Sequence, residues 1–273
     1  LRCDRRIQTG QQLVERVDER AHLLGFVTLG KRAEVPRRAR GDLAAQPVQG
    51  PQSLADAEPQ ESDRREGDQD LRNGGSDQQF RHLENLRRVV DVRALLDARE
   101  RLAILLQPDP DPDGIASGYT LRALLGRRRT TAPLVSFGEV KRAENRAMVQ
   151  ALGIEVKTIS LSDLDDFDAL ALVDVQPSVF GEVMSPRLRK VDVVIDHHPS
   201  RSGYESAFVD IRTGYGATAT ILTEYVRAAE LEITPRLATA LLYGIKSDTQ
   251  LLGRETSRED IDAFAFLHAL HSP

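Results

Sequence analysis

Short apolar runs that end in acidic residues recur along the second half of the chain. In one of them the β-branched run Val191–Ile195 leads into the triplet Asp196-His197-His198. A run of this kind indicates a buried strand, so the triplet is expected just beyond the strand's carboxyl end. Open α/β sheets place their ligand sites at that edge. The triplet is therefore a candidate functional site, and a solvated strand end whose histidines cap a turn is the alternative.

Strand patterns and helix patterns alternate from residue 101 onward. Strands are expected at residues 101–107, 133–137, 154–159 and 168–175, and in the run that ends at Asp196. Helices are expected at residues 83–99, 115–125, 142–152 and 216–229, from Pro235 after the N-cap Thr234, and after the capping-box pair Thr256 and Glu259. This alternation predicts an α/β fold with a mainly parallel sheet and helices on both of its faces.

The amino-terminal part of the chain has a different composition. Between Arg40 and Gln79 there is no aromatic residue and no isoleucine, and polar residues, Gly and Pro crowd the stretch. Such a segment buries too little apolar surface to offset the entropy lost on ordering. We therefore expect residues 1–79 to form a disordered tail. Because the first residue is Leu, this tail need not be native, and residues 80–273 are expected to form the folded domain.

Charge and cysteine content exclude several classes of protein. A net charge of −5 argues against binding of duplex DNA, because phosphate neutralisation supplies most of the non-specific affinity for it. Cys3 is the one cysteine, which excludes an internal disulfide framework and fits a reducing compartment. No apolar run has the length of a membrane helix. We expect a cytoplasmic protein without a membrane partner, and its oligomeric state is not readable from the sequence.

An acidic loop rich in proline follows the first predicted strand. Asp109, Asp111 and Asp113 lie two residues apart, so an extended chain would place their side chains on one face. A polyproline-like loop would fan them out instead. Crowded carboxylates raise one another's pKa unless a cation is present, so the loop suggests a preformed metal cradle. A solvated acidic turn is the alternative.

Two more acids follow predicted elements elsewhere. Asp174 comes directly after the apolar strand 169–173, which would place it at the same edge of the sheet, with a turn cap before Pro177 as the alternative. Asp248 lies at a predicted helix end, where the negative end of the dipole disfavours a carboxylate. Another group is therefore expected to hold Asp248.

Two segments offer groups for a phosphate. Residues Gly214–Thr218 precede a predicted helix, and their N–H groups could cradle a phosphate, although a simple turn is the alternative. Arg142 and Asn145 could reach a substrate, or they could form the polar face of their own helix.

The acidic and histidine motifs together carry a resemblance. In chain order they are Pro110-Asp111-Pro112-Asp113-Gly114-Ile115-Ala116-Ser117, Val173-Asp174, Asp196-His197-His198 and Ser247-Asp248-Thr249. This ordered set, over roughly residues 102–270, resembles the DHH phosphoesterase superfamily. The chain looks most like the branch of oligoribonucleases and 3′-phosphoadenosine-5′-phosphate phosphatases. The resemblance implies a manganese-dependent phosphoesterase, a hydrolase that acts on short RNA or phosphorylated nucleotides through a water activated by two metals.

The resemblance also implies roles for individual residues. It implies two Mn²⁺ ions, with Mg²⁺ or Co²⁺ as substitutes, whose ligands are Asp111 on one ion, Asp113, His197 and Asp248 on the other, and Asp174 on both. His198 would contact the substrate phosphate, and Arg142 and Asn145 are further substrate-binding candidates. Gln107 stands where the family usually has a ligand histidine. Its neutral amide is a weaker manganese ligand than imidazole.

Two rival functions remain. Gln107 favours a non-catalytic nucleotide-binding, phosphate-binding or interaction module. So does the lack of the glycine-rich second domain with which members of the family usually bind substrate, because no such motif precedes Pro273. An inorganic pyrophosphatase is the other rival.

Overall fold

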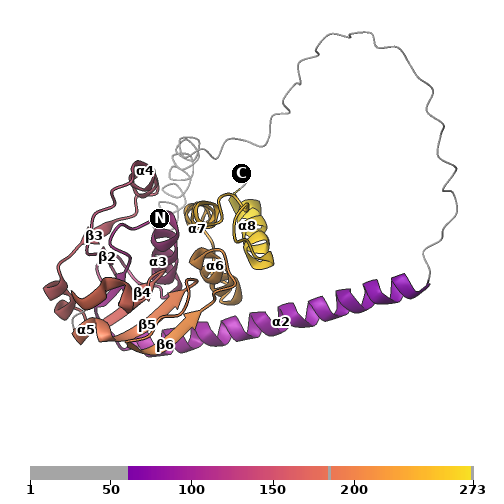
Figure 1. Cartoon of the computed structure of the whole chain (residues 1–273), viewed down its shortest axis with the longest axis horizontal. Helices are drawn as coiled ribbons and strands as arrows, with labels where there is room; N and C mark the ends of the chain where they lie inside the picture. Colours follow the sequence, from indigo (N-terminus) through magenta and orange to yellow (C-terminus); the bar gives the residue numbers. More distant parts are fainter. Residues whose placement is uncertain (1–60, 184–185, 272–273) are drawn as a thin grey trace, which may run out of the picture. The chain divides into compact units, whose positions relative to one another are not determined.

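The computed structural model describes residues 61–183 and 186–271, with side chains for 77–181 and 186–270. Residues 1–60, where most of the expected disordered tail falls, lie outside this part. The predicted α/β fold is confirmed, because the described residues form one six-stranded sheet in the order β3-β2-β1-β4-β5-β6. Every neighbouring pair of strands is parallel (Figure 1).

The strands are β1 Leu102–Leu105, β2 Leu134–Ser136, β3 Val156–Thr158, β4 Ala169–Val173, β5 Lys190–Asp196 and β6 Glu205–Ile211. The first five lie where the apolar runs predicted them. The sixth was not predicted, because most of its residues are exposed or half-buried at the edge of the sheet and its apolar run, Ala207–Val209, is short.

The helices are α2 Glu61–Asp97, α3 Pro112–Leu124, α4 Ala143–Ala151, α5 Pro186–Arg189, α6 Thr218–Ala228, α7 Pro235–Asp248 and α8 Arg258–His271, with 3₁₀ segments η1 Leu161–Asp166 and η2 Pro177–Val183. Several starts differ from the prediction, those of α4 and α6 by only one and two residues. Helix α3 begins at Pro112 rather than residue 115, because proline is tolerated at the first helical position behind the N-cap Asp111. Helix α8 is capped by Ser257 and Asp260, one residue beyond the predicted pair.

Helix α2 begins at Glu61, far before the predicted residue 83. It thus includes residues 61–79, which the sequence analysis assigned to the amino-terminal tail. The stretch holds no proline and is rich in Glu, Arg, Gln and Asp, so helix can continue through it although it has almost no apolar face. The chain divides into two compact units at Arg81 and His82, and the remaining elements all belong to the unit that contains His82.

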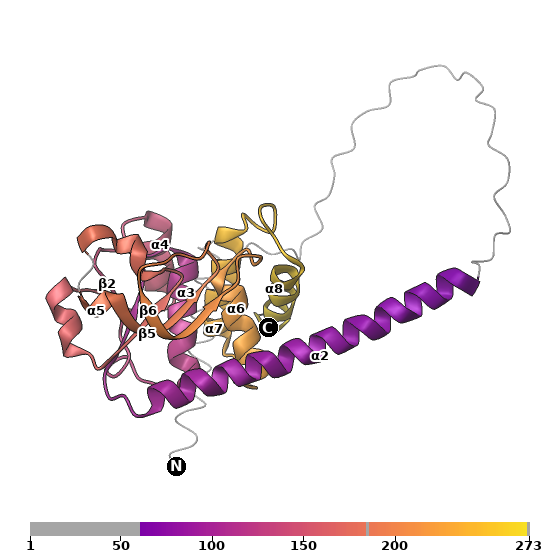
Figure 2. The same cartoon turned by 60° about the horizontal axis from the view of Figure 1, so that its bottom comes forward.

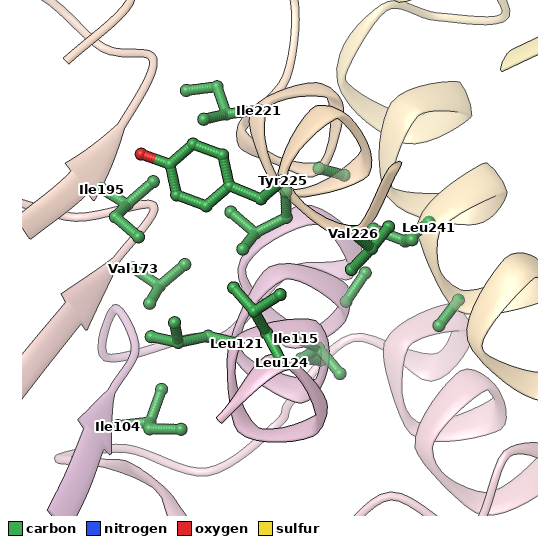
Figure 3. Close-up of a cluster of buried hydrophobic side chains, with 14 of the residues drawn as sticks. Ile104, Ile115, Leu121, Leu124, Val173, Ile195, Ile221, Tyr225, Val226 and Leu241 are labelled. Carbon is green, nitrogen blue, oxygen red and sulfur yellow. The ribbon is translucent and has the colours of Figure 1, made fainter. Parts of the chain in front are cut away.

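Two apolar layers cover the two faces of the sheet. On one face Ile104, Val173 and Ile195 from three strands pack against helices α3, α6 and α7 (Figure 3). The fully buried Tyr225 of α6 and Leu121 of α3 fill this layer.

The opposite layer is smaller and has shorter covering segments. It contains Leu105, Leu172 and Val194 of the strands with Leu164 of η1 and Leu188 of α5. Figure 2 shows the sheet between α5 and the group α3, α6 and α7. Both faces are therefore covered, although unequally. Within the described ranges, no helix combines the length and the apolar character needed to cross a membrane.

Candidate metal centre

Acidic side chains from three distant segments and a histidine from a fourth meet beyond the carboxyl ends of β1, β4 and β5. His197 lies at their centre: its Nε2 is 3.3 Å from Asp248 Oδ2, 3.6 Å from Asp174 Oδ1 and 3.9 Å from Asp113 Oδ2. Parallel strands bring these residues together, because their carboxyl ends share one edge of the sheet. The predicted convergence of these four residues is therefore present in the structure.

Asp111 lies on another side of this cluster. A β-carbon built on Gly114 would lie 3.3 Å from Asp174 Oδ2 and 3.5 Å from Asp111 Oδ1, so only a glycine leaves the space between the two carboxylates open. Asp111 Oδ1 also accepts a hydrogen bond of 2.9 Å from the Gly114 N–H as the N-cap of α3.

Asp113 is fully buried and is held by the start of helix α6. Its two carboxylate oxygens accept hydrogen bonds from the N–H groups of Thr218 and Ala219, both at 2.7 Å. These amides lie at the positive end of the α6 dipole, which favours a carboxylate there. The last residue of the segment proposed from sequence as a phosphate cradle, Thr218, thus directs its N–H group at an acid of the cluster, as does the next residue, Ala219.

Asp174 adopts a backbone conformation that is rare for a non-glycine residue. Its φ is +61°, in the left-handed region, and its side chain is 2% exposed. Oδ1 accepts a hydrogen bond of 2.9 Å from Thr218 Oγ1, whereas Oδ2 has no hydrogen-bond partner within the described residues. Strain and an unpaired buried oxygen at one residue indicate a functional constraint.

Each histidine of the triplet is oriented by a different partner. His197 Nδ1 lies 3.0 Å from the Tyr215 carbonyl oxygen, which fixes Nδ1 as the donor and turns Nε2 toward the acids. His198 Nδ1 lies 2.8 Å from Asp196 Oδ1, and half of the His198 side chain is exposed. One ring therefore faces the cluster and the other lies at its rim.

Close packing of α7 brings Asp248 into reach. A β-carbon on Gly244 would lie 3.1 Å from the Ala219 Cβ and 3.3 Å from the Asp113 Cα, so glycine allows α7 to lie directly against α3 and α6. Asp248 ends α7 one turn later. The group that was expected to hold this carboxylate against the helix dipole includes His197.

The cluster contains more carboxylates than cationic side chains. Burial and the charge of Asp248 raise the pKa of Asp113 to about 7. Burial and the neighbouring acids raise the pKa of Asp174 well above its usual range, and burial also raises that of Asp111. Burial would lower the pKa of His197, but Asp248 and Asp113 together raise it to about 9. Each shift reduces the net negative charge of the cluster.

The donor set fits a divalent cation. Two triads have donor atoms within 4.8 Å of one another, Asp113 with His197 and Asp248, and Asp174 with His197 and His198. His197 Nε2, like Asp174 Oδ2, is buried without a hydrogen-bond partner in the described part of the chain. Carboxylate and imidazole are ligands that manganese, iron and zinc accept.

The remaining sequence candidates lie beside the cluster. Asp109 accepts a hydrogen bond from the Lys141 N–H and lies 3.7 Å from the Arg142 guanidinium, so it turns away toward α4. Asn145 is buried and donates to the Pro110 carbonyl at 3.0 Å. The Gln107 side chain hydrogen-bonds Asp111 and so partly offsets the rise in its pKa.

Sequence reasoning missed two polar residues of this region. Thr218 binds both Asp113 and Asp174, and the buried Gln176 donates to Asp196 Oδ2 at 2.7 Å. Thr218 stood in a segment already noted for phosphate, but Gln176 carries no motif. The only feature of the sequence that could have indicated Gln176 is its position directly after Asp174-Val175, at the end of a buried strand.

Known proteins are similar to the central part of the chain. A family model described as "DHH family, N-terminal domain" matches residues 101–245. An uncharacterized protein of Methanocaldococcus jannaschii is 38% identical over 168 residues, which cover 62% of this chain and 34% of that protein. The "Probable manganese-dependent inorganic pyrophosphatase" of Deinococcus radiodurans is 32% identical over 175 residues, 61% of this chain and 52% of that protein.

The chain thus spans about a third and about half of the length of these two curated relatives. A solved structure, described as an exopolyphosphatase-related protein from Bacteroides fragilis, is 13% identical with a TM-score of 0.49. That match covers 68% of this chain and 57% of the other chain.

Proposed function

Because the chain belongs to the DHH family, we propose that it is a metal-dependent hydrolase that cleaves phosphoester bonds. One observation carries this proposal. Three carboxylates surround His197 with too few cationic side chains to balance them, and two of the buried donor atoms have no partner in the described residues. A purely structural cluster would have its polar atoms paired.

The proposed cation ligands divide into two groups. Asp113, His197 and Asp248 would hold one cation, Asp111 would hold a second with Gln107 as a weaker ligand, and Asp174 would contribute to both. The manganese-dependent relative supports Mn²⁺ as the natural ion, with Mg²⁺ or Co²⁺ as substitutes. When bound, two such cations lower the pKa of a water and offset the charge of the phosphoryl oxygens.

The protein's own groups orient the substrate and handle its charge. His198 contacts the substrate phosphate: its Nδ1 is engaged by Asp196, which leaves Nε2 as the nitrogen that meets the ligand. A partner carboxylate raises the pKa of His198, and the cationic ring suits a phosphate oxygen. The Asn145 side chain, bound to Pro110, acts on substrate only by holding the acidic loop.

The proposed substrates are short oligonucleotides or phosphorylated nucleotides. Water adds to phosphorus and the bond to the leaving oxygen breaks, which releases an alcohol and a phosphate. Inorganic pyrophosphate is the second candidate, because one relative carries that activity in its name.

A substrate panel tests the proposal. The purified chain is incubated with Mn²⁺ and bis-p-nitrophenyl phosphate, a short RNA, 3′-phosphoadenosine-5′-phosphate or pyrophosphate. The variant Asp174→Asn removes a carboxylate inside the cluster. The matched control Asp109→Asn removes a carboxylate of the acidic loop that lies outside the cluster. We expect turnover that needs the metal, is lost in the first variant and persists in the second.

Other outcomes decide between the candidates. Preference for pyrophosphate would select the second substrate. Manganese binding without turnover of any of the four compounds would contradict the hydrolase and support a phosphate-binding module. Turnover that persists in Asp174→Asn would place the chemistry elsewhere.

A further inference from the structure

A buried glutamine holds the loop that carries the two histidines. Gln176 is 1% exposed and follows Asp174 by two residues. Its Nε2 donates to Asp196 Oδ2 at 2.7 Å and to the Pro199 carbonyl at 3.1 Å, and its Oε1 accepts from the Arg201 N–H at 2.7 Å. The nitrogen and the oxygen of this amide thus both bind the segment from Asp196 to Arg201.

The carboxylate of Asp196 links this glutamine to His198. Asp196 is 1% exposed, and while its Oδ2 is bound by Gln176, its Oδ1 lies 2.8 Å from His198 Nδ1 and 3.2 Å from the His198 N–H. Gln176 and His198 thus bind the two different oxygens of one buried carboxylate. The glutamine therefore helps to hold this carboxylate in one orientation.

An amide suits this position better than other side chains of its size. It donates to a buried carboxylate without adding a charge, and it accepts an N–H at its other end. A glutamate at residue 176 would direct a second negative charge at Asp196, and a methionine would leave Asp196 Oδ2 and the Arg201 N–H without partners.

We propose that Gln176 is a positioning residue that acts on substrate through Asp196 and His198. The proposal rests on the proposed function, in which His198 contacts the substrate phosphate. Gln176 lies on the far side of Asp196 from the ring and makes its three hydrogen bonds to the loop. It holds the imidazole at the rim of the cluster in the orientation that presents Nε2.

Turnover of the preferred substrate tests this role with the variants Gln176→Met, His198→Ala and the double variant. Loss of an outer-shell partner of this kind costs about 10–100-fold, so we expect kcat of Gln176→Met to fall by about that factor. Calorimetric Mn²⁺ affinity is expected to stay within about threefold of the parent, since Gln176 contacts no proposed cation ligand. Gln150→Met, on the exposed face of α4, is the matched control and should leave both quantities unchanged.

The double variant separates positioning from general structural damage. If Gln176 acts through His198, adding Gln176→Met to His198→Ala lowers kcat no further, and the double-mutant cycle is strongly non-additive. Additive losses of kcat, or an equal loss of Mn²⁺ affinity in Gln176→Met, would overturn the proposal.

A spectroscopic measurement keeps this test independent of turnover. The ¹⁵N chemical shifts of the His198 ring report the hydrogen bond at Nδ1, and we expect them to change in Gln176→Met while those of His197 stay the same. Unchanged His198 shifts would refute the positioning role. If the parent chain turns over no substrate, the proposed function fails, and these shifts still decide whether Gln176 orients the ring.

Discussion

The chain buries two clusters of charged side chains, and they are built in opposite ways. One is the acidic pocket of Asp111, Asp113, Asp174, His197 and Asp248. The other, here called the arginine network, joins β6, α6 and the last turns of α2 through Asp210, Arg212, Glu224, Tyr225, Arg88 and Asn85.

Every charge of the arginine network meets an opposite charge. Arg212 forms ion pairs of 2.7 Å with Asp210 and 2.6 Å with Glu224, and Arg88 reaches Asp210 at 2.6 Å. Tyr225 donates to Asp210 at 2.6 Å, and Asn85 donates to Glu224 at 3.0 Å. Burial would lower the pKa of Arg212, but its hydrogen bonds to Asp210 raise it.

The acidic pocket lacks this balance. Burial and the neighbouring acids raise the pKa values of Asp113 and Asp174. A buried network whose charges are all paired stabilises one arrangement of the chain and needs no further ligand. Buried carboxylates that lack paired cations favour the binding of a cation from solution. We therefore assign cation binding to the acidic pocket and a structural role to the arginine network.

The largest expected effect is that of Asp174→Asn in the pocket. Asparagine tolerates the left-handed backbone at this position, so the variant removes charge with little change of shape. We expect turnover to fall by about 10³-fold, because transition-state charge loses its stabilisation. We also expect the metal-free protein to be as stable as the parent or more so, since one repelling acid is gone. A lower melting temperature of metal-free Asp174→Asn would contradict the contrast between the clusters.

Arg212→Leu, in the arginine network, should instead lower the stability of the protein. Removing one partner of a buried ion pair leaves an uncompensated charge, and we expect a loss of about 3–5 kcal/mol in the free energy of unfolding. Urea denaturation measures it with and without Mn²⁺. The loss should be the same in both conditions, and a loss that appears only with Mn²⁺ would assign Arg212 to the metal site.

The metal-free pocket should make stability depend on pH. Asp113 has a folded-state pKa raised to about 7, so the stability it contributes is complete below its unfolded pKa near 4 and is lost as pH rises through 7. His197, with a pKa raised to about 9, has the same sign, and its contribution is lost between about pH 6.5 and 9. Melting temperatures of the chelator-treated protein should therefore fall from pH 5 to 9, and saturating Mn²⁺ should flatten the curve. A rise with pH in the chelated protein would contradict these assignments.

Gln107→His should strengthen the weaker half of the pocket. Imidazole is a better manganese ligand than a neutral amide, and we expect the second Mn²⁺ to bind about 10-fold more tightly or more. Calorimetric titration of both proteins measures this change. Gln107→Leu is the control that removes the amide without adding a ligand, and equal affinities in all three chains would exclude residue 107 from the site.

The smallest effect is expected for Arg142→Ala. Its ion pair with Asp109 is exposed and long, and such pairs contribute between zero and about 1 kcal/mol. Melting temperature and Mn²⁺ affinity should both stay close to the parent values. A large rise in KM with no change in stability would instead support the substrate contact predicted for Arg142 from the sequence.

Local patterns were sufficient for most of the fold. Apolar runs predicted five of the six strands, and Pro235 behind Thr234 predicted the start of α7, where the Thr234 hydroxyl accepts a hydrogen bond from Leu237. These features depend on neighbours in sequence, through periodicity and capping. The sixth strand and the amino-terminal half of α2 did not follow from the same patterns, because the edge strand has only a short apolar run and the helix has almost no apolar face.

The sequence by itself identified the acids and histidines of the acidic pocket, through the order of their motifs and the family resemblance that those motifs carry. Only the tertiary structure decided how each is held. The Tyr215 carbonyl behind His197, the Thr218 hydroxyl on Asp174 and the Gln176 amide on Asp196 all come from segments 18 to 44 residues away. Hydrogen bonds over such separations leave no periodicity in the chain. They arise from the packing of helices on the sheet, which sets which polar groups are buried together.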